Sequence, residues 1–284
     1  MNRTIWLLLS ISLVGPLCGC AAGPQIIAHR GASNLAPENT VAAAKLAWEK
    51  NADAVEVDVY LSQDKQVVVI HDKTTKRTAG EELEVAKSTA AELRKLDVGS
   101  FKGEQYAGER IPLLEEVIAT MPPKKQLFVE IKCGPEVLEP LQKIIVASGK
   151  REQIVIIGFG FDTVKASKKL MPDIPTYWLV GTKRDKETEA WIPHSPDLVD
   201  DVVASGLDGL NVHWAGVDKA FVKSVRKADL GLYTWTVNDP LEAARLSKLG
   251  IDGITTDRPG WLRDQLKGIN RVLRVIQKGL RGDD

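Results

Sequence analysis

Short apolar runs alternate with longer segments of helical periodicity along almost the whole chain. Runs such as 67–70 and 153–157 are apolar at nearly every position, which is typical of parallel strands that are buried on both faces. The longer segments repeat apolar residues at the spacing of one helix face. The predicted strands are 25–28, 54–61, 67–70, 126–131, 153–157, 176–180, 209–212, 231–236 and 252–255, and the predicted helices are 39–50, 89–96, 113–121, 135–148, 162–170, 197–205, 218–228, 240–249 and a last one from 261 onward.

This alternation predicts an α/β fold with a parallel sheet. About eight such units follow one another without a long linker, which favours a single-domain (β/α)8 TIM barrel. An open doubly wound sheet is the alternative, but no glycine-rich GxGxxG turn follows the first predicted strand. We assign residues 25–265 to the barrel, with a short excursion at 73–111, and residues 266–284 to a C-terminal helical tail. The tail is basic and amphipathic, and we interpret it as the end of the last barrel helix rather than as a helix on a membrane surface.

The first twenty residues differ from the rest of the chain. Arg3 precedes an uncharged apolar run at 4–17, which is too short to indicate a transmembrane helix, and we interpret residues 1–20 as a secretory signal. Its end, LCGC, resembles the lipobox of bacterial lipoproteins, so we expect a lipid on Cys20 and attachment to a membrane. An ordinary signal cleaved near Ala21 is the alternative. Either interpretation predicts export across the inner membrane to the periplasm or cell envelope.

Composition excludes two classes of site. Lys plus Arg equals Asp plus Glu at 38 each, so no broad basic field is available to hold nucleic acid, and any anion site must be local. The chain has 3 cysteines and no CxxC pair, so neither a disulfide framework nor a cysteine metal cluster is expected. Hydrophobic residues make up 44% of the chain, enough for a fold that depends on its core.

Polar side chains that directly follow two apolar runs suggest chemistry. His29 and Arg30 follow the predicted strand 25–28, and His71 follows the predicted strand 67–70. The active site of a TIM barrel lies at the carboxyl ends of its strands. Histidine transfers protons near neutral pH, and arginine binds phosphate through two parallel hydrogen bonds. Taken alone, a histidine at a strand end is more often structural, so these residues indicate an active site only when they occur together.

Carboxylates within two predicted strands point to a cation. Glu56 and Asp58 lie two residues apart and therefore share one face of their strand. Two carboxylates that face the same way inside an apolar sheet repel each other unless a cation lies between them. Glu130 and Lys132 repeat this spacing on another strand, where a structural ion pair is the alternative. Hard oxygen ligands of this kind suit Ca²⁺ or Mg²⁺.

Several short motifs between about residue 25 and residue 262 share their order and wording with one enzyme family. The motifs are His29-Arg30-Gly31, Pro37-Glu38-Asn39-Thr40, Glu56-Val57-Asp58, His71-Asp72, Glu130-Ile131-Lys132, Trp235-Thr236-Val237-Asn238 and Thr256-Asp257-Arg258-Pro259. In this order they resemble the glycerophosphodiester phosphodiesterase family, whose fold is a TIM barrel.

The resemblance implies a role for each of these residue types. The acidic residues would hold one divalent cation, Ca²⁺ or Mg²⁺, and two histidines would form a general acid/base pair. Two cationic residues would contact phosphate, one tryptophan would wall the substrate pocket, and Glu38 would act at the substrate site by orienting Arg30 or the metal, unless it is only a helix-start charge. The implied sets are Glu56, Asp58 and Glu130 for the metal, His29 and His71 for catalysis, and Arg30, Lys132, Trp235 and Glu38 for substrate binding.

The implied function is metal-dependent hydrolysis of a small-molecule glycerophosphodiester to glycerol phosphate and an alcohol. A barrel phospholipase that acts on another phosphodiester lipid is one alternative, and a non-catalytic binding lipoprotein is another. Intact proton-shuttling histidines argue against a binder, because binding alone does not require them. We expect the remaining histidines, His194 and His213, to be structural, and Asn39 and Thr40 to cap a helix.

Overall fold

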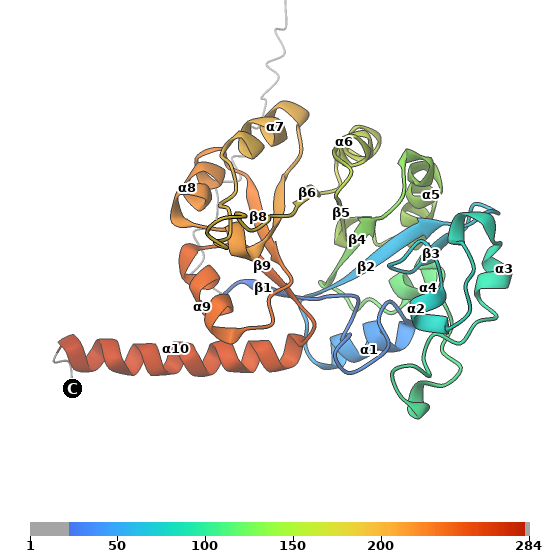
Figure 1. Ribbon diagram of the computed structural model, residues 1–284, viewed down its shortest axis with the longest axis horizontal. Helices are drawn as coiled ribbons and strands as arrows, with labels where there is room; N and C mark the ends of the chain where they lie inside the picture. The colour runs from blue at the N-terminus through green and yellow to red at the C-terminus, as the bar shows by residue number, and fades with distance from the viewer. Residues whose placement is uncertain (1–22, 282–284) are drawn as a thin grey trace, which may run out of the picture.

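Eight parallel strands close into a barrel in the computed structural model, which describes residues 23–281, with only the backbone described for 274–281 (Figure 1). Around the ring the order is β1-β9-β8-β7-β6-β5-β4-β2, and pairing of β1 with β2 closes it. The predicted TIM barrel is therefore confirmed over the open sheet. The barrel strands are β1 (Gln25–Ala28), β2 (Ala54–Leu61), β4 (Gln126–Ile131), β5 (Ile154–Gly158), β6 (Thr176–Val180), β7 (Gly209–His213), β8 (Gly231–Trp235) and β9 (Gly253–Thr256).

The strand β3 (Val67–Val69) lies outside this ring and runs antiparallel to β2. Interpreting the apolar run 67–70 as a parallel strand was therefore wrong, although its placement next to β2 is confirmed. Only a short turn separates the two strands, and a connection of that length permits antiparallel pairing alone. Ile70 N donates to Asp58 O at 3.0 Å, so β3 runs back along β2 and brings the following residue, His71, close to Asp58.

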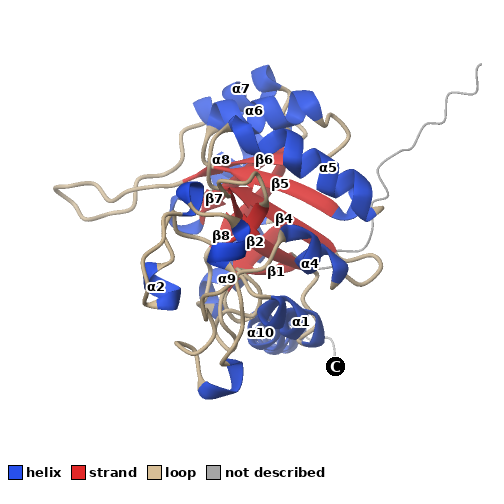
Figure 2. Cartoon of the chain, turned by 90° about the vertical axis from the view of Figure 1, so that its right-hand side faces the viewer, coloured by secondary structure: helices blue, strands red, loops and turns tan. Residues whose placement is uncertain are grey.

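Helices surround the strands on the outside, as Figures 1 and 2 show. Thr40 caps the first of them through a bond from Ala43 N, and Asp218 and Asp239 cap two others. Asn39 does not cap, which corrects that prediction, because its side chain bonds a buried carboxylate instead. The helices are α1 (Val41–Glu49), α2 (Lys76–Ala79), α3 (Ala90–Leu93), α4 (Leu114–Ala119), α5 (Leu138–Ser148), α6 (Phe161–Leu170), α7 (Asp197–Ser205), α8 (Lys219–Lys227), α9 (Pro240–Leu249) and α10 (Pro259–Arg281), with short 3₁₀ turns at Val85–Lys87, Glu104–Tyr106, Pro135–Val137, Arg151–Gln153 and Trp214–Gly216.

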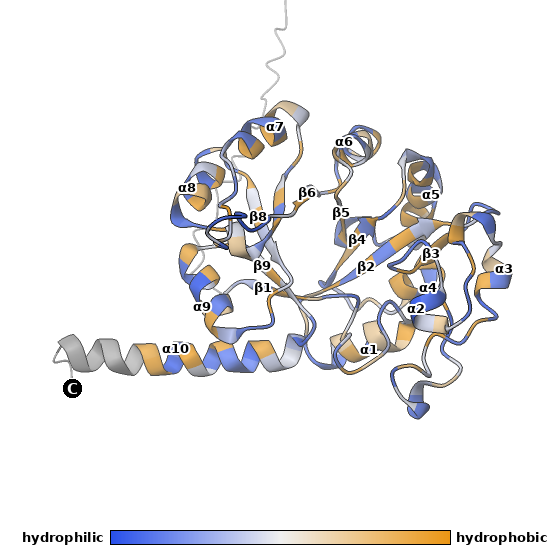
Figure 3. Cartoon of the chain, in the orientation of Figure 1, coloured by the Kyte–Doolittle hydropathy of each residue, from blue (hydrophilic) through white to orange (hydrophobic). Residues whose placement is uncertain are grey.

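Side-chain alternation along the strands divides the core into two layers. Figure 3 shows hydrophobic and hydrophilic residues following one another along β2. In β2, Val55, Val57 and Val59 belong to the layer between barrel and helices, so Glu56 and Asp58 point into the barrel. The barrel interior is filled below them by apolar side chains that include Ile27, Phe128, Val155 and Leu179. Two carboxylates therefore stand directly above an apolar floor.

The excursion between β3 and α4 has its own apolar cluster, which includes Val85, Leu93 and Ile111. It carries α2, which lies beside the mouth of the barrel. At the other end of the chain, α10 runs on past the barrel (Figure 1). Among the helices of the described residues, none combines the length and apolar character that crossing a membrane requires. The predicted signal at 1–20, with Cys20, lies outside the described residues.

Candidate active site

Three carboxylates meet at the carboxyl ends of β2 and β4. The strand register places Asp58 directly beside Glu130, and Glu56 lies one inward-facing position below Asp58. One oxygen from each of the three lies within 4.8 Å of the others. All three are buried, with exposed fractions of 2% for Glu56, 1% for Asp58 and 8% for Glu130. The structure therefore brings together the three residues that the sequence singled out as metal ligands.

Electrostatics of this triad fit a cation site. Burial, together with the neighbouring carboxylates, raises the pKa of Glu56 and of Glu130. Glu56 Oε2 accepts a hydrogen bond from Arg30 N at 2.8 Å, but the buried Oε1 has no partner among the described residues. An unpaired buried carboxylate oxygen is costly, and an oxygen-rich group of this kind is what Ca²⁺ and Mg²⁺ prefer. The donor set therefore fits a hard divalent cation.

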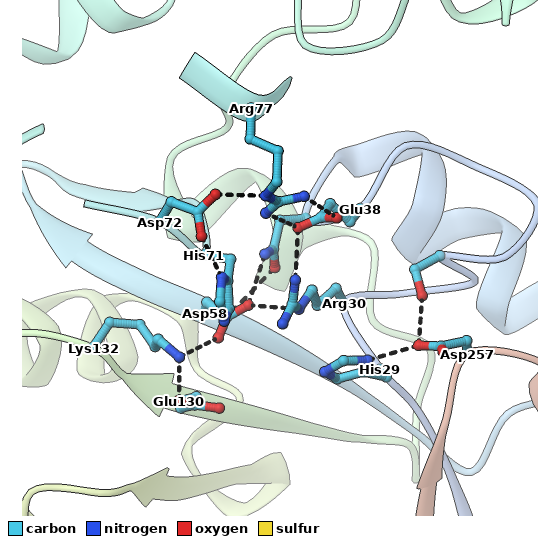
Figure 4. Close-up of polar contacts among 12 residues, drawn as sticks. His29, Arg30, Glu38, Asp58, His71, Asp72, Arg77, Glu130, Lys132 and Asp257 are labelled. Carbon is cyan, nitrogen blue, oxygen red and sulfur yellow. Dashed lines mark hydrogen bonds and ion pairs between the residues drawn. The ribbon is translucent and has the colours of Figure 1, made fainter. Parts of the chain in front are cut away.

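Two cationic side chains flank the triad, and Figure 4 shows them beside Asp58 and Glu130. Lys132 Nζ lies 2.7 Å from Glu130 Oε1 and 3.4 Å from Asp58 Oδ1, while Arg30 Nε lies 3.3 Å from Asp58 Oδ2. Burial alone would lower the pKa of Lys132, but the Glu130 and Asp58 carboxylates raise it, so the ammonium stays charged. Arg30 and Lys132, the two residues predicted to bind phosphate, thus lie beside the triad, where their positive charges can attract an anion.

Asn39 holds Asp58 in place through two bonds. Its Nδ2 donates to Asp58 Oδ2 at 2.8 Å, and Asp58 N donates to its Oδ1 at 3.1 Å. Asn39 has φ 59°, in the left-handed region that asparagine tolerates better than most residues. Its sequence position beside Thr40 suggested a helix cap, whereas the structure uses it to orient a site carboxylate.

His29 pairs with a carboxylate from the far end of the chain. Its Nδ1 donates to Asp257 Oδ1 at 2.7 Å, and Ser33 Oγ and Asn238 Nδ2 donate to the same carboxylate at 3.2 and 2.6 Å. Burial alone would raise the pKa of Asp257, but the His29 bond and charge and these other donors lower it to about 2. The ionised carboxylate fixes the ring and leaves Nε2 free for chemistry in the cavity.

His71 has a matching partner in the next residue along the chain. Its Nδ1 donates to Asp72 Oδ1 at 2.6 Å, and Arg77 Nε donates to Asp72 Oδ2 at 2.6 Å. Burial lowers the pKa of His71, against the opposing charge of Asp58. The site therefore has two histidines, each oriented at Nδ1 by an ionised carboxylate.

Arg77 connects the partner of His71, Asp72, to the partner of Arg30, Glu38. Besides Asp72, it binds both oxygens of Glu38 at 2.7 Å, and Arg30 Nη1 donates to Glu38 Oε1 at 2.8 Å. Glu38 therefore orients Arg30, which is one of the two roles considered for it. Sequence reasoning did not identify Arg77, because it lies in the excursion, where no periodicity marks it. Asp72 and Asp257 stood inside matched motifs but received no role from the sequence; the need of each histidine for an orienting carboxylate is the signal that could have identified them.

A cavity of about 210 Å³ opens between these groups. The residues that line one side of it are His29, Arg30, His71, Glu56, Glu130 and Lys132. The other side is formed largely by apolar and aromatic residues, Ile157, Phe159, Leu179 and Trp235, with Asn211, Thr236 and Thr255 completing the lining.

The predicted pocket tryptophan, Trp235, does lie in this wall. Its Nε1 donates to Asn211 O at 3.1 Å, and its ring meets Phe159 edge-on at 5.4 Å. The other two histidines lie outside the group of cavity-lining residues: His194 Nε2 donates to His213 O at 2.8 Å, and the His213 ring stacks on Trp214. Both make the structural contacts expected of them.

Comparison with known proteins gives one consistent answer. The model of the Glycerophosphoryl diester phosphodiesterase family matches residues 29–261. A glycerophosphodiester phosphodiesterase from Caldanaerobacter subterraneus is 36% identical over 241 residues, covering 82% of this chain and 94% of the relative.

Solved structures agree in fold and in family. An Oleispira antarctica phosphodiesterase in complex with the product sn-glycerol-3-phosphate aligns with a TM-score of 0.76 at 28% identity, covering 86% of this chain and 97% of the other. A glycerophosphodiester phosphodiesterase from Thermotoga maritima aligns with a TM-score of 0.69 at 27% identity, covering 86% and 99%.

Proposed function

The chain belongs to the glycerophosphoryl diester phosphodiesterase family, and on that premise we propose that it hydrolyses glycerophosphodiesters with one divalent cation and a pair of catalytic histidines. The observation that carries this proposal is that two carboxylate-oriented histidines line one cavity together with Glu56 and Glu130, two members of the buried carboxylate triad. Hydrolysis of glycerophosphodiesters is the activity of the family. The metal and the residue roles are our inference.

Glu56, Asp58 and Glu130 would hold the cation, Ca²⁺ or Mg²⁺. When bound, such an ion neutralises charge on the phosphoryl oxygens as it grows in the transition state. Glu56 Oε1, buried and without a hydrogen-bond partner in the described chain, supports this assignment. Arg30 and Lys132 would bind the phosphate beside the triad, with Glu38 keeping Arg30 aimed at it.

Proton transfer would divide between the two histidines. We assign His71 as the general base, because its lowered pKa keeps the ring neutral at neutral pH. Its Nε2 takes the proton of the attacking hydroxyl as that oxygen bonds to phosphorus. His29, held at Nδ1 by Asp257, gives its Nε2 proton to the alcohol oxygen as the bond from phosphorus to that oxygen breaks.

The attacking hydroxyl belongs either to water or to the glycerol moiety of the substrate, which would give a cyclic phosphate first. The step that releases the alcohol uses the same two proton transfers in both routes. In the cyclic route, water then attacks the cyclic phosphate and opens it in a second step, with the proton-transfer roles of the two histidines reversed. Phosphorus NMR of early time points separates the routes by the presence or absence of the cyclic species. The Oleispira antarctica relative is in complex with sn-glycerol-3-phosphate. By extension, glycerol phosphate and a free alcohol are the products proposed for this chain.

The test is a panel of glycerophosphodiesters assayed with Ca²⁺, Mg²⁺ and Mn²⁺ in turn, with His29→Ala and His71→Ala as variants. Each variant should lower turnover by about 10²-fold or more, the usual scale for a general acid or base. Near-normal turnover by both variants would refute the histidine roles. Absence of any turnover by the wild-type enzyme across the panel would refute the substrate class.

We also propose that the protein is exported and held at the cell envelope through lipid on Cys20. This rests on the sequence alone, since Cys20 lies outside the described residues. Mass spectrometry of the N-terminal fragment from cells should find a diacylglyceryl mass on Cys20 in wild type and none in Cys20→Ala. An unmodified fragment that begins near Ala21 would support the ordinary signal instead.

A further inference from the structure

Asn211 is a buried side chain in the cavity wall that the proposed mechanism does not use. It lies on β7, is 1% exposed, and lines the cavity. Its Oδ1 has no hydrogen-bond partner among the described residues. A buried polar atom left unpaired is costly, and such atoms are rare in folded proteins.

The surroundings of Asn211 explain why Oδ1 has no partner within the described part of the chain. The register places Leu179 and Tyr233 beside it on the two neighbouring strands, and Ile157 lies in the same wall. Trp235 has already committed its Nε1 to the Asn211 main-chain oxygen, at 3.1 Å. The main chain of Asn211 is thus held by Trp235, and its carboxamide belongs to an apolar and aromatic part of the cavity wall.

Asn211 also lies opposite the charged groups. In the closed ring of eight strands, β7 is four positions from β2 in either direction, so Asn211 faces the strand that carries Glu56 and Asp58. A phosphate bound at Arg30 and Lys132 would occupy the β2 side. The uncharged part of the same molecule would then reach the β7 side.

We propose that Asn211 hydrogen-bonds a hydroxyl of the glycerol moiety and thereby sets specificity for glycerol over other alcohols. A carboxamide offers an acceptor and a donor, which together match a hydroxyl, whereas a phosphate oxygen needs donors alone. The apolar wall around Asn211 suits the carbon chain of glycerol, and about 210 Å³ suits a group of that size. This inference rests on the proposed function and identifies one of its substrate contacts.

A contact of this kind predicts strong discrimination against substrates that lack the hydroxyl. Binding such an analogue leaves the carboxamide unpaired in the filled cavity. The analogue therefore binds more weakly, because one hydrogen bond is missing and the desolvated carboxamide has no partner. The expected loss in kcat/KM is roughly 10- to 100-fold.

The experiment compares three phosphocholine diesters, those of glycerol, 1,2-propanediol and 1,3-propanediol, which remove either glycerol hydroxyl in turn. Each is assayed with wild type, Asn211→Leu and Thr234→Val. Thr234 is the matched control, because it is equally buried on the next strand, its Oγ1 is also unpaired, and it is not among the residues that line the cavity. Circular dichroism and thermal unfolding check that each variant folds.

Wild type and Thr234→Val should both prefer the glycerol diester over one of the two analogues by 10-fold or more. Asn211→Leu should lose most of that preference while still hydrolysing the analogue. Equal loss on all three substrates in Asn211→Leu, or no preference in wild type, overturns the inference. If Asn211→Leu fails to fold, Asn211→Ser and the wild-type preference decide the question. A wild type that cleaves none of the diesters refutes the proposed function instead, so the two failures are distinct.

Discussion

His29 and Asp257 are separated by 228 positions in the chain, yet Nδ1 of the first and Oδ1 of the second lie 2.7 Å apart. Closure of the barrel produces this contact. β1 pairs with β9 in register, and His29 N donates to Thr256 O at 2.9 Å, so the residues that follow the two strands emerge side by side. The orientation of His29, one of the two proposed catalytic histidines, is therefore a property of the closed barrel.

Asp257→Asn should lower kcat by about 10- to 100-fold, because an amide does not fix the Nδ1–H tautomer of His29 or stabilise its charged form. Steady-state kinetics with glycerophosphocholine measures this. Asp239→Asn is the matched control: Asp239 caps α9, and asparagine caps about as well. Wild-type kcat in Asp257→Asn would mean that His29 does not depend on this carboxylate.

Arg77→Ala should lower kcat by about 10-fold without unfolding the protein, since Arg77 aligns both Asp72 and Glu38 from an exposed position. Arg77→Lys should recover little, because an ammonium cannot make the paired bonds of a guanidinium. Lys76→Ala, one residue away, removes only a bond to Gly80 O and serves as control. Full activity in Arg77→Ala would show that the contacts of Arg77 with Asp72 and Glu38 have no positioning role.

The pH profile of kcat/KM tests the assignment of His71 as base. The neutral form is the active one, so activity falls as pH drops through the pKa of His71. Because burial lowers that pKa below the ordinary 6.5, half of the activity should remain at some pH below 6.5. Asp72→Asn removes a bond that holds the pKa up, so its midpoint should lie lower still. A midpoint above 6.5, or an upward shift in Asp72→Asn, contradicts the assignment.

Phe128 tests the apolar floor beneath the site. It is fully buried in the barrel and meets Tyr233 edge-on at 5.3 Å. Phe128→Ala should lower the free energy of unfolding by about 3–5 kcal/mol in urea titrations. Phe101→Ala, at a residue 49% exposed in the excursion, should change it by only about 0.5 kcal/mol or less. Similar values for both variants would contradict the two-layer core.

The periodicity of the sequence predicted the barrel, because buried parallel strands and amphipathic helices leave a repeating pattern. The direction of β3 was harder to predict than its existence. The run 67–70 has the apolar pattern of any buried strand, and only the short turn between β2 and β3 makes the pair antiparallel. Asn39 stands where a capping residue would stand, but the buried Asp58 competes for the same amide. The local sequence does not reveal whether the Asn39 side chain binds the helix backbone or Asp58.

The site residues likewise fall into those that a local pattern predicts and those that depend on the folded structure. Glu56, Asp58 and Glu130 could be grouped from the sequence, because their spacing places them on inward faces at strand ends. The partner of His29 depends on barrel closure over 228 positions, and Arg77 comes from a loop without periodicity. Asn211 gave no sequence signal, because its role follows from an unpaired atom that only coordinates can show.

The most direct test of the central claim is turnover of glycerophosphocholine by chelator-treated enzyme as Ca²⁺ or Mg²⁺ is added back. Removing the cation should abolish turnover while circular dichroism stays unchanged, and adding it back should restore the rate in wild type but not in Glu130→Gln. Full turnover without a divalent cation, or equal restoration in Glu130→Gln, would contradict a metal site formed by Glu56, Asp58 and Glu130.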